Sequence, residues 1–484
     1  MTTTLLTPVT RRRGARVAWL AYAALATALA LFGIAHWLVA LVIRGPVLYG
    51  EGAVAHAAIL ARDGLEYTTG ASYGDTAPIF TAANYPPLYF HLAAIGDDPF
   101  VTGRIVSIVA TLFVAAAIAW RARPAGRLVA ASLAIAWLAS VPVIQWGPAV
   151  KPDLVALAFT VGAVMALDRE RPRHALAGAL LGYAAMAKPT ALLPAIAMFV
   201  FVWRADRRAA LRALGAGLIG AIAVALVTHG PDDAARVHVI DWNALPWHFD
   251  LAVSLALLGL VLLAVPLLTI AVTRPSRTIV TAYAVGATGI VILGGREGAT
   301  INYLLDLSAA VALAVAGRAP LLATAWRYPI AAIAQAALAV LLLSPFGMIP
   351  GRTVTTGAWG EGSRIAAVRA IRGTLLVEDS GLLVATGREP LVDDVFLWSR
   401  NRAREVVGGF SFTEGERLLN AVRATKFDAV ISEADLTSLD EVGGFERQRW
   451  HPDLVNAILD RYRLDRGLSG GGGSILFVYV PRGR

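Results

Sequence analysis

The chain has no cysteine among its 484 residues. Disulfides, thiolate nucleophiles and cysteine-ligated metal centres are therefore excluded. Charge is also scarce, because Asp, Glu, Lys and Arg make up only 16% of the residues, whereas a soluble globular chain carries roughly 25%. Hydrophobic residues account for 57%, and the mean hydropathy is +0.62. These values exclude a disordered chain, a coiled coil and an ordinary cytosolic enzyme.

Motifs for nucleotide or metal chemistry are lacking as well. No GxSxG, Walker or GxGxxG motif stands in the required context, and the histidines of residues 229–248 match no zinc template. Gly470–Gly473 lacks the lysine of a phosphate-binding loop, so we interpret it as a hairpin tip. We expect no cofactor and no metal site, although a divalent metal stays open. We attribute the net charge of +9 to basic residues that set membrane topology and not to nucleic-acid binding, so no nucleic-acid partner is expected.

Long apolar runs are what the chain has in abundance. A helix needs about 20 residues to cross a bilayer. Eleven runs approach or exceed this length, and they predict an α-helical multi-pass membrane protein. They fall near residues 17–43, 101–120, 128–146, 150–167, 174–187, 189–203, 211–228, 251–272, 279–294, 301–317 and 328–347. The runs 174–187 and 189–203 leave one alternative open, because a single tilted helix there would reverse everything that follows.

Basic residues favour the eleven-span arrangement. Met1–Arg16 holds four arginines and no acid, and the apolar run after it is longer than the 7–15 residues of a signal-peptide core. With eleven spans, the loops on the N-terminal side hold 18 arginines and only three acids. Because cytoplasmic loops are enriched in Lys and Arg, we expect a cytoplasmic N-terminus, a C-terminus on the opposite face, and a bacterial plasma (inner) membrane location.

The C-terminal segment, 351–484, differs from the transmembrane module, 1–350. It is charged at ordinary density. Helix-like stretches at 362–371, 413–425 and 452–462 alternate with β-type runs at 374–377, 429–431 and 475–480. We therefore expect a small extracytoplasmic α/β domain.

Charges beside the outer ends of spans are the candidate site residues, because topology does not explain them and ionisable groups near a membrane mark function. The first outer loop, 44–100, is long; it carries Glu51 just beyond the first span and reaches Tyr85-Pro86-Pro87-Leu88-Tyr89. Lys151, Lys188 and Arg296 lie at other outer turns, followed closely by Asp153, by Thr190 and by Asn302 and Tyr303. A solvated loop acid or a snorkelling lysine is the alternative for each. Three cations and several acids on one face together indicate an anionic substrate.

These segments resemble the GT-C superfamily of polyprenyl-phosphate-sugar-dependent glycosyltransferases, in particular its bacterial branch related to protein O-mannosyltransferases and aminoarabinose transferases. The resemblance covers residues 17–347. It rests on the order and shared side of Tyr49-Gly50-Glu51-Gly52, the Tyr85–Tyr89 run, Lys151-Pro152-Asp153, Gly182–Leu193 and Asn302–Leu305. This chain departs from the family where many relatives carry Asp-Glu, because it has Gly50-Glu51.

The resemblance implies an integral-membrane glycosyltransferase that moves a sugar from a polyprenyl-phosphate donor to a glycan, lipid or protein acceptor of the cell envelope. Lys151, Lys188 or Arg296 would neutralise the phosphate leaving group. Glu51 would be the general base of a single, inverting displacement. Tyr85, Pro86, Pro87, Tyr89, Asp153, Asn302 and Tyr303 would contact substrate, and the lipid chain would lie between spans. The alternative is a transporter, flippase or polymerase of lipid-linked glycans, but the chain shows no repeated halves.

Overall fold

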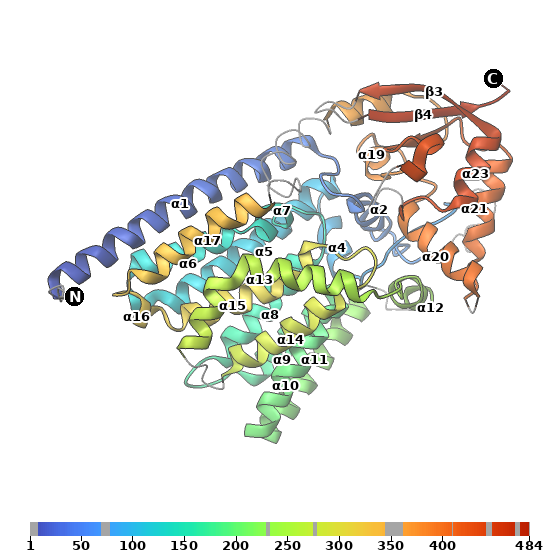
Figure 1. Ribbon diagram of the computed structural model, residues 1–484. Helices are drawn as coiled ribbons and strands as arrows, with labels where there is room; N and C mark the ends of the chain where they lie inside the picture. Colours follow the sequence, from blue (N-terminus) through green and yellow to red (C-terminus); the bar gives the residue numbers. More distant parts are fainter. Residues whose placement is uncertain are drawn as a thin grey trace.

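In the computed structural model, the described residues are 8–68, 78–228, 233–273, 278–343, 362–408, 410–441, 448–469 and 475–483. They form a bundle of apolar helices and a smaller α/β unit, which we call the tail (residues 362–483). The tail packs against one end of the bundle, which we call the tail end (Figure 1). This arrangement matters for function because the predicted site residues lie at that end.

Every apolar run expected to span is helical in the structure. The helices are α1 (Pro8–Ile43), α5 (Pro99–Ala122), α6 (Arg127–Leu138), α7 (Val141–Trp146), α8 (Asp153–Leu167), α9 (His174–Ala187), α10 (Leu192–Ala205), α11 (Arg207–Val227), α13 (Phe249–Val272), α14 (Ile279–Leu293), α15 (Leu305–Ala316) and α17 (Arg327–Leu343). The run expected at 128–146 is broken into α6 and α7 near Ser140, where Pro142 lacks an amide hydrogen for the ladder. Within the described ranges, α11, α13, the Arg13–Ile43 part of α1, and α5 continued to Ala125 (Pro99–Ala125) are long and apolar enough to cross a membrane by themselves.

Short helices and turns join these elements. In the bundle they are α2 (Glu51–Leu60), α4 (Leu88–Ala94), η2 (Arg123–Ala125), η3 (Pro189–Ala191), α12 (Asp233–Arg236), η4 (Val237–Asp241), η5 (Ile301–Leu304) and α16 (Ala319–Leu322). The helix α2 is buried along most of its length, under the tail. The first loop is therefore a packed part of the protein and not a solvated connection.

Glycine contacts fix the direction of the helices around Lys188. A side chain at Gly178 or Gly182 of α9 would collide with the backbone at Ala213 or Gly217 of α11. Both pairs advance by four residues, so α9 and α11 run parallel, with small residues allowing close approach. Because α11 runs in the same direction as α9, the chain must reverse direction twice between them. It does so once at Lys188–Ala191, before α10, and once at Asp206, after α10. The single tilted helix left open by the sequence is therefore not formed.

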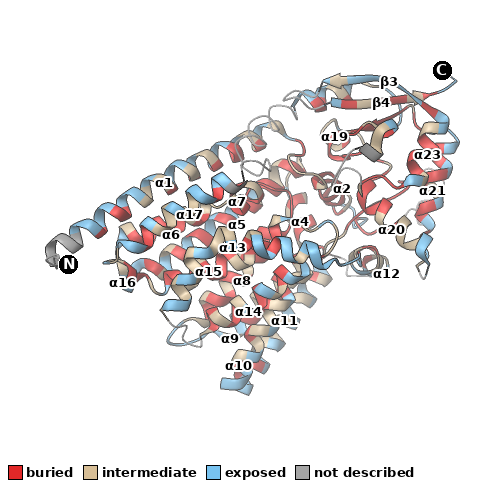
Figure 2. Cartoon of the chain, viewed as in Figure 1, coloured by how far each residue is buried: buried red, intermediate tan, exposed pale blue. Residues whose placement is uncertain are grey.

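Apolar side chains cover the outside of the bundle. Only 6% of the apolar window of α13 and 17% of that of α11 is buried. Figure 2 shows exposed residues along the outward faces of the bundle helices. Soluble proteins do not expose apolar surface on this scale, so these faces are suited to contact with lipid.

The tail is built on a four-stranded sheet in the order β1-β2-β4-β3. The strands are β1 (Leu375–Val377), β2 (Ala429–Ser432), β3 (Tyr462–Ser469) and β4 (Ile475–Pro481), with β1 parallel to β2 and the other pairs antiparallel. Its helices are residues 362–370, α19 (Gly381–Val384), α20 (Val395–Val407), α21 (Thr413–Arg423), η7 (Leu436–Glu441) and α23 (Pro452–Arg461).

The sequence predicted three of these strands and three of these helices, but it missed β3, α19, α20 and η7. β3 alternates polarity weakly and is mostly exposed, which hides it from a pattern search. The predicted hairpin tip, Gly470–Gly473, and the boundary expected near residue 350 lie outside the described residues.

The tail shares a core with the loops of the bundle. Phe80 of the first loop packs against Trp242 and against Phe412 of the tail, with ring centroids 5.0 and 5.7 Å apart. The backbone of Phe80 also forms a parallel bridge with Val392. Since these contacts are buried in one apolar cluster, the tail is held over the tail end of the bundle.

Candidate active site

Asp153, at the start of α8, joins three of the predicted site residues. Its oxygen Oδ1 accepts two hydrogen bonds, one from Lys188 Nζ at 2.5 Å and one from Asn302 Nδ2 at 2.8 Å. The Lys188 ammonium also lies 4.9 Å from the centre of the Tyr303 ring. The other oxygen, Oδ2, is buried and has no hydrogen-bond partner among the described residues. The cluster is therefore polar but incompletely satisfied.

Arg296 extends this cluster. Its guanidinium donates to the backbone and side-chain oxygens of Asn243, at 2.9 and 3.0 Å, and to the Tyr303 hydroxyl at 3.3 Å. These contacts hold the guanidinium plane in one orientation. Arg296 makes no ion pair within the described ranges, so its positive charge is not neutralised by a protein carboxylate.

Lys151 occupies the turn before α8. Its ammonium donates to the Gly50 carbonyl at 2.6 Å and makes no ion pair in the described part of the chain. Burial lowers the pKa of Lys151 below its usual value, although four carboxylates, among them Asp394, Glu51 and Asp153, act in the opposite direction. Lys151 is thus a buried hydrogen-bond donor with capacity left over.

Tyr85 connects the two halves of the site. Its phenol lies within electrostatic reach of Asp153, Arg296 and Asp394, and burial raises the pKa of Tyr85 well above its usual value. The phenol therefore stays protonated and can act as a neutral hydrogen-bond donor.

Three other predicted contacts lie behind the cluster. Tyr89 is fully buried, and its hydroxyl donates to Gly103 and contacts Ser107, both at 3.0 Å. Pro86 and Pro87 lead into α4, with Pro87 as its capping residue. These residues shape the chain that presents Tyr85. This geometry does not support substrate contact by Tyr89, because its hydroxyl already forms hydrogen bonds within the protein.

Glu51 is enclosed. Its side chain is 0% exposed. One oxygen accepts from Val47 N at 2.6 Å and Arg104 at 3.0 Å, and the other accepts from Val150 N at 2.7 Å. The expected role of Glu51 as a base on an acceptor is not supported by this geometry, because the side chain is fully buried and both of its oxygens accept hydrogen bonds inside the protein. Glu51 instead ties the end of α1, α5 and the Lys151 turn together.

Sequence reasoning missed Arg104 and Asp394. Arg104 lies inside an apolar run. A charged residue in such a run is energetically costly, and this cost could have identified Arg104 as a candidate functional residue. Asp394 caps α20 of the tail and lies 345 residues from its partner Tyr49. The helix cap could be read from the sequence, but no local pattern could bring it to Tyr49.

Among the described residues, no group of three or more His, Asp or Glu side chains is arranged to hold a metal ion. His238, one of the histidines considered from the sequence, accepts from Ala83 N at 3.1 Å and packs against Trp242. It therefore serves the packing of the first loop.

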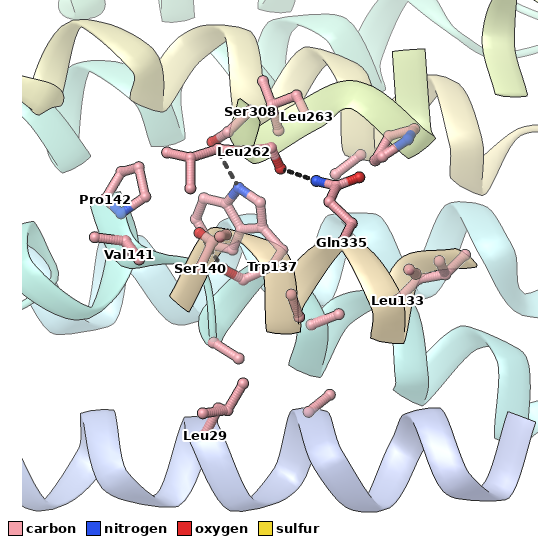
Figure 3. A pocket seen from close by; sticks show the side chains of 18 of the residues that line it. Leu29, Leu133, Trp137, Ser140, Val141, Pro142, Leu262, Leu263, Ser308 and Gln335 are labelled. Carbon is pink, nitrogen blue, oxygen red and sulfur yellow. Dashed lines mark hydrogen bonds between the residues drawn. The ribbon is translucent and has the colours of Figure 1, made fainter. Parts of the chain in front are cut away.

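An apolar cavity of about 510 Å³ lies in the bundle between α1, α6, α13, α15 and α17. Figure 3 shows Leu29, Leu133, Leu262 and Leu263 around it, with few polar groups. Trp137 and Ser308 are hydrogen-bonded to each other at 3.1 Å on its wall. Leu304 of η5 also lines the cavity, while the preceding residues of η5, Asn302 and Tyr303, belong to the polar cluster. The cavity and the cluster are therefore neighbours.

Comparison with known proteins agrees with this arrangement. The model of glycosyltransferase family 87 matches residues 78–242. The fold is similar to that of ArnT from Cupriavidus metallidurans. The structure of ArnT bound to undecaprenyl phosphate aligns with a TM-score of 0.56 at 13% identity, and the apo structure with 0.54 at 14%. Each alignment covers 93% of this chain and 97% of ArnT. No curated protein sequence matches the chain.

These matches confirm the resemblance to membrane glycosyltransferases predicted from the sequence, and with it the glycosyltransferase class. The matched segment, 78–242, contains Tyr85, Lys151, Asp153 and Lys188. Arg296, Asn302 and Tyr303 lie outside that segment and reach the cluster through the fold.

Proposed function

We propose that this protein transfers a sugar from a polyprenyl-phosphate donor to an acceptor of the cell envelope. The observation that carries the proposal is the match of residues 78–242 to a glycosyltransferase family, in a fold that sets buried cations beside an apolar cavity. ArnT, which has a similar fold, was crystallised with undecaprenyl phosphate. A phosphate on a long apolar chain needs both of these features at once.

The donor phosphate would bind at Lys151, with Lys188 and Arg296 contributing positive charge. Lys151 is the best placed, because its ammonium has no carboxylate partner among the described residues, whereas Lys188 is paired with Asp153. Donors aimed at the phosphate stabilise the negative charge that develops on it as the sugar leaves. Tyr85, Asn302 and Tyr303 would orient the donor.

The prenyl chain would lie in the cavity between α1, α13 and α17. Leu304 and Ser308 line that cavity, close behind the polar residues of η5. A donor bound in this way would have its phosphate at the cluster and its first isoprene units against η5.

The reaction would be a single displacement with inversion at the anomeric carbon. The acceptor oxygen forms a bond to that carbon, the bond to the phosphate oxygen breaks, and its electron pair stays on polyprenyl phosphate. One base must take the proton of the acceptor hydroxyl. A transporter of lipid-linked glycans is not favoured, because it does not account for the family match.

For topology, we propose eleven spans in a bacterial inner membrane, with the N-terminus cytoplasmic. The extracytoplasmic face would then hold the α/β tail and the site. Arginine-rich loops at the other end of the bundle support this orientation.

The test is sugar transfer by the full-length protein in lipid vesicles, from a panel of radiolabelled polyprenyl-phosphate sugars to a cell-envelope lipid extract. Lys151→Met should lower both polyprenyl-phosphate binding and transfer, Lys151→Arg should retain part of each, and Lys426→Met, at an exposed lysine of the tail, should change neither. Wild-type protein that neither binds polyprenyl phosphate nor transfers a sugar would refute the proposal.

A further inference from the structure

The tail brings two carboxylates, Asp394 and Asp379, within electrostatic reach of Lys151 at the candidate site. Asp394 precedes α20, and one of its oxygens, Oδ1, accepts from the Tyr49 hydroxyl at 3.0 Å and from Leu397 N at 2.9 Å. The Tyr49 oxygen in turn accepts from Phe396 N at 3.0 Å. Asp394 is thereby held in one orientation by the first loop and by its own helix.

The second oxygen of Asp394, Oδ2, lies near Lys151, beside Gly50. A Cβ atom placed on Gly50 would lie 3.8 Å from Asp394 Oδ2 and 3.0 Å from Lys151 Nζ. The carboxylate and the ammonium therefore both lie close to the space that a side chain at residue 50 would fill. No hydrogen bond among the described residues reaches Oδ2, so this oxygen has lone pairs to offer.

Gly50 keeps this space open. It has a φ of +77°, a conformation that favours glycine, and its missing side chain leaves room between Asp394 and Lys151. Asp394 and Lys151 retain 9% and 8% of their exposure, whereas the Glu51 side chain retains none. Asp394 is therefore less completely enclosed than Glu51.

We propose that Asp394, supplied by the tail, is the general base that takes the proton from the acceptor hydroxyl, and that Tyr49 is the residue that positions it. The inference rests on the proposed function. In the step, the acceptor oxygen bonds to the anomeric carbon, the carbon–phosphate-oxygen bond breaks, and the hydroxyl proton moves to Oδ2. Lys151, which lies close to the same space beside Gly50, meets the charge that develops on the leaving phosphate.

The chemistry of the surroundings fits this role. Burial raises the pKa of Asp394 above its usual value, while the neighbouring Lys151 and Tyr49 act to lower it and Asp393 to raise it. Tyr85 also lies within electrostatic reach. A carboxylate with a raised pKa is a stronger base than an exposed one once it is ionised.

The experiment compares Asp394→Asn, Tyr49→Phe and wild type in the vesicle assay, with binding of polyprenyl phosphate and thermal melting measured on each. Asp465→Asn is the matched control, because Asp465 is a tail carboxylate on β3 that contacts only Arg466 in the described structure. Since a general base contributes roughly 10²–10⁴-fold, we expect Asp394→Asn to lose at least about a hundredfold in kcat. Its donor KM, binding and melting should be unchanged. Tyr49→Phe should lose less and show a shifted pH profile, because the carboxylate would be less firmly held.

The outcomes separate the two proposals. Asp394→Asn with near wild-type kcat would overturn the inference while leaving the glycosyltransferase function intact. So would a variant that melts early or no longer binds polyprenyl phosphate, since the carboxylate would then only hold the tail in place. Wild-type transfer that rises with pH, beside flat residual activity in Asp394→Asn, would support it. Wild type that transfers from no donor overturns the proposed function, and the inference falls with it.

Discussion

Replacement of Glu51 should destabilise the protein more than it impairs the chemistry. Glu51 and Arg104 form a buried ion pair at 3.0 Å, with both side chains 0% exposed. Removal of one partner of such a pair typically costs about 3–5 kcal/mol, because the other charge stays buried without compensation. Glu51→Ala also removes the acceptor of Val47 N and Val150 N, two backbone donors that the fold leaves without another partner in the described contacts. The expected loss is therefore at the upper end of this range.

Two further variants distinguish the ion pair from the hydrogen bonds. Glu51→Gln keeps the shape and one acceptor oxygen but leaves the Arg104 charge buried without a counter-charge, so it should lose about 3–5 kcal/mol, less than Glu51→Ala, which also leaves the backbone donors without an acceptor. Glu51→Leu with Arg104→Met removes both charges, and should recover part of the loss seen in either single variant. Arg104 donates from one nitrogen only, to Glu51 and to the Gly45 carbonyl, so its removal leaves few other groups unpaired.

The assay is thermal unfolding of purified protein in detergent, with sugar transfer measured in parallel below the melting temperature. We expect melting temperatures to fall in the order wild type, Glu51→Gln, Glu51→Ala, and transfer per folded molecule to remain substantial in Glu51→Gln. A Glu51→Gln variant that melts like wild type yet loses transfer by a hundredfold would refute this reasoning and restore Glu51 as the base.

Two other predictions follow from single contacts. Burial alone would lower the pKa of His56, but Asp393 at 2.7 Å and Glu389 raise it from 6.5 to about 9. The stabilisation of the folded state by protonated His56 is therefore complete below pH 6.5 and is lost as the pH rises through about 9. Since one pKa unit corresponds to about 1.4 kcal/mol, this stabilisation amounts to about 3 kcal/mol. His56→Gln should flatten the dependence of melting temperature on pH between about 6 and 10. Gly178→Ala should cost roughly 1–3 kcal/mol, because the new methyl group collides with the Ala213 backbone. Gly215→Ala, with open space around it, should be neutral or slightly stabilising; equal melting temperatures for the two variants would contradict the close packing of α9 on α11.

Sequence patterns were sufficient for the bundle because the bilayer imposes them. Apolar length and arginine placement are requirements on each helix separately, so all eleven runs could be located without knowing their neighbours. Lysine usage carried a further signal: the chain has only Lys151, Lys188 and Lys426, while arginine fills the loops. Two of the three lysines are buried at the site.

The parts that sequence could not supply depend on contacts between distant segments. Glu51 is the first acid after the first span, and nothing local shows that Arg104 and the Val150 amide enclose it. Asp394 reads as a helix cap of the tail, and only the shared core around Phe80 and Trp242 brings it to Tyr49. A carboxylate's role follows from what occupies its oxygens, and that information is tertiary.

The carboxylates around Lys151 illustrate this rule. Three of them, Glu51, Asp153 and Asp394, lie within its electrostatic reach, yet they differ in how far they are satisfied. Glu51 uses both oxygens inside the protein, whereas Asp153 Oδ2 and Asp394 Oδ2 accept no hydrogen bond in the described structure. A buried polar atom left unpaired, such as Asp153 Oδ2, costs about 1–3 kcal/mol. Folding alone gives no reason to keep it near an ammonium whose hydrogen-bond partner among the described residues is the Gly50 carbonyl. A substrate with a hydroxyl to donate and a phosphate to accept would satisfy all three groups.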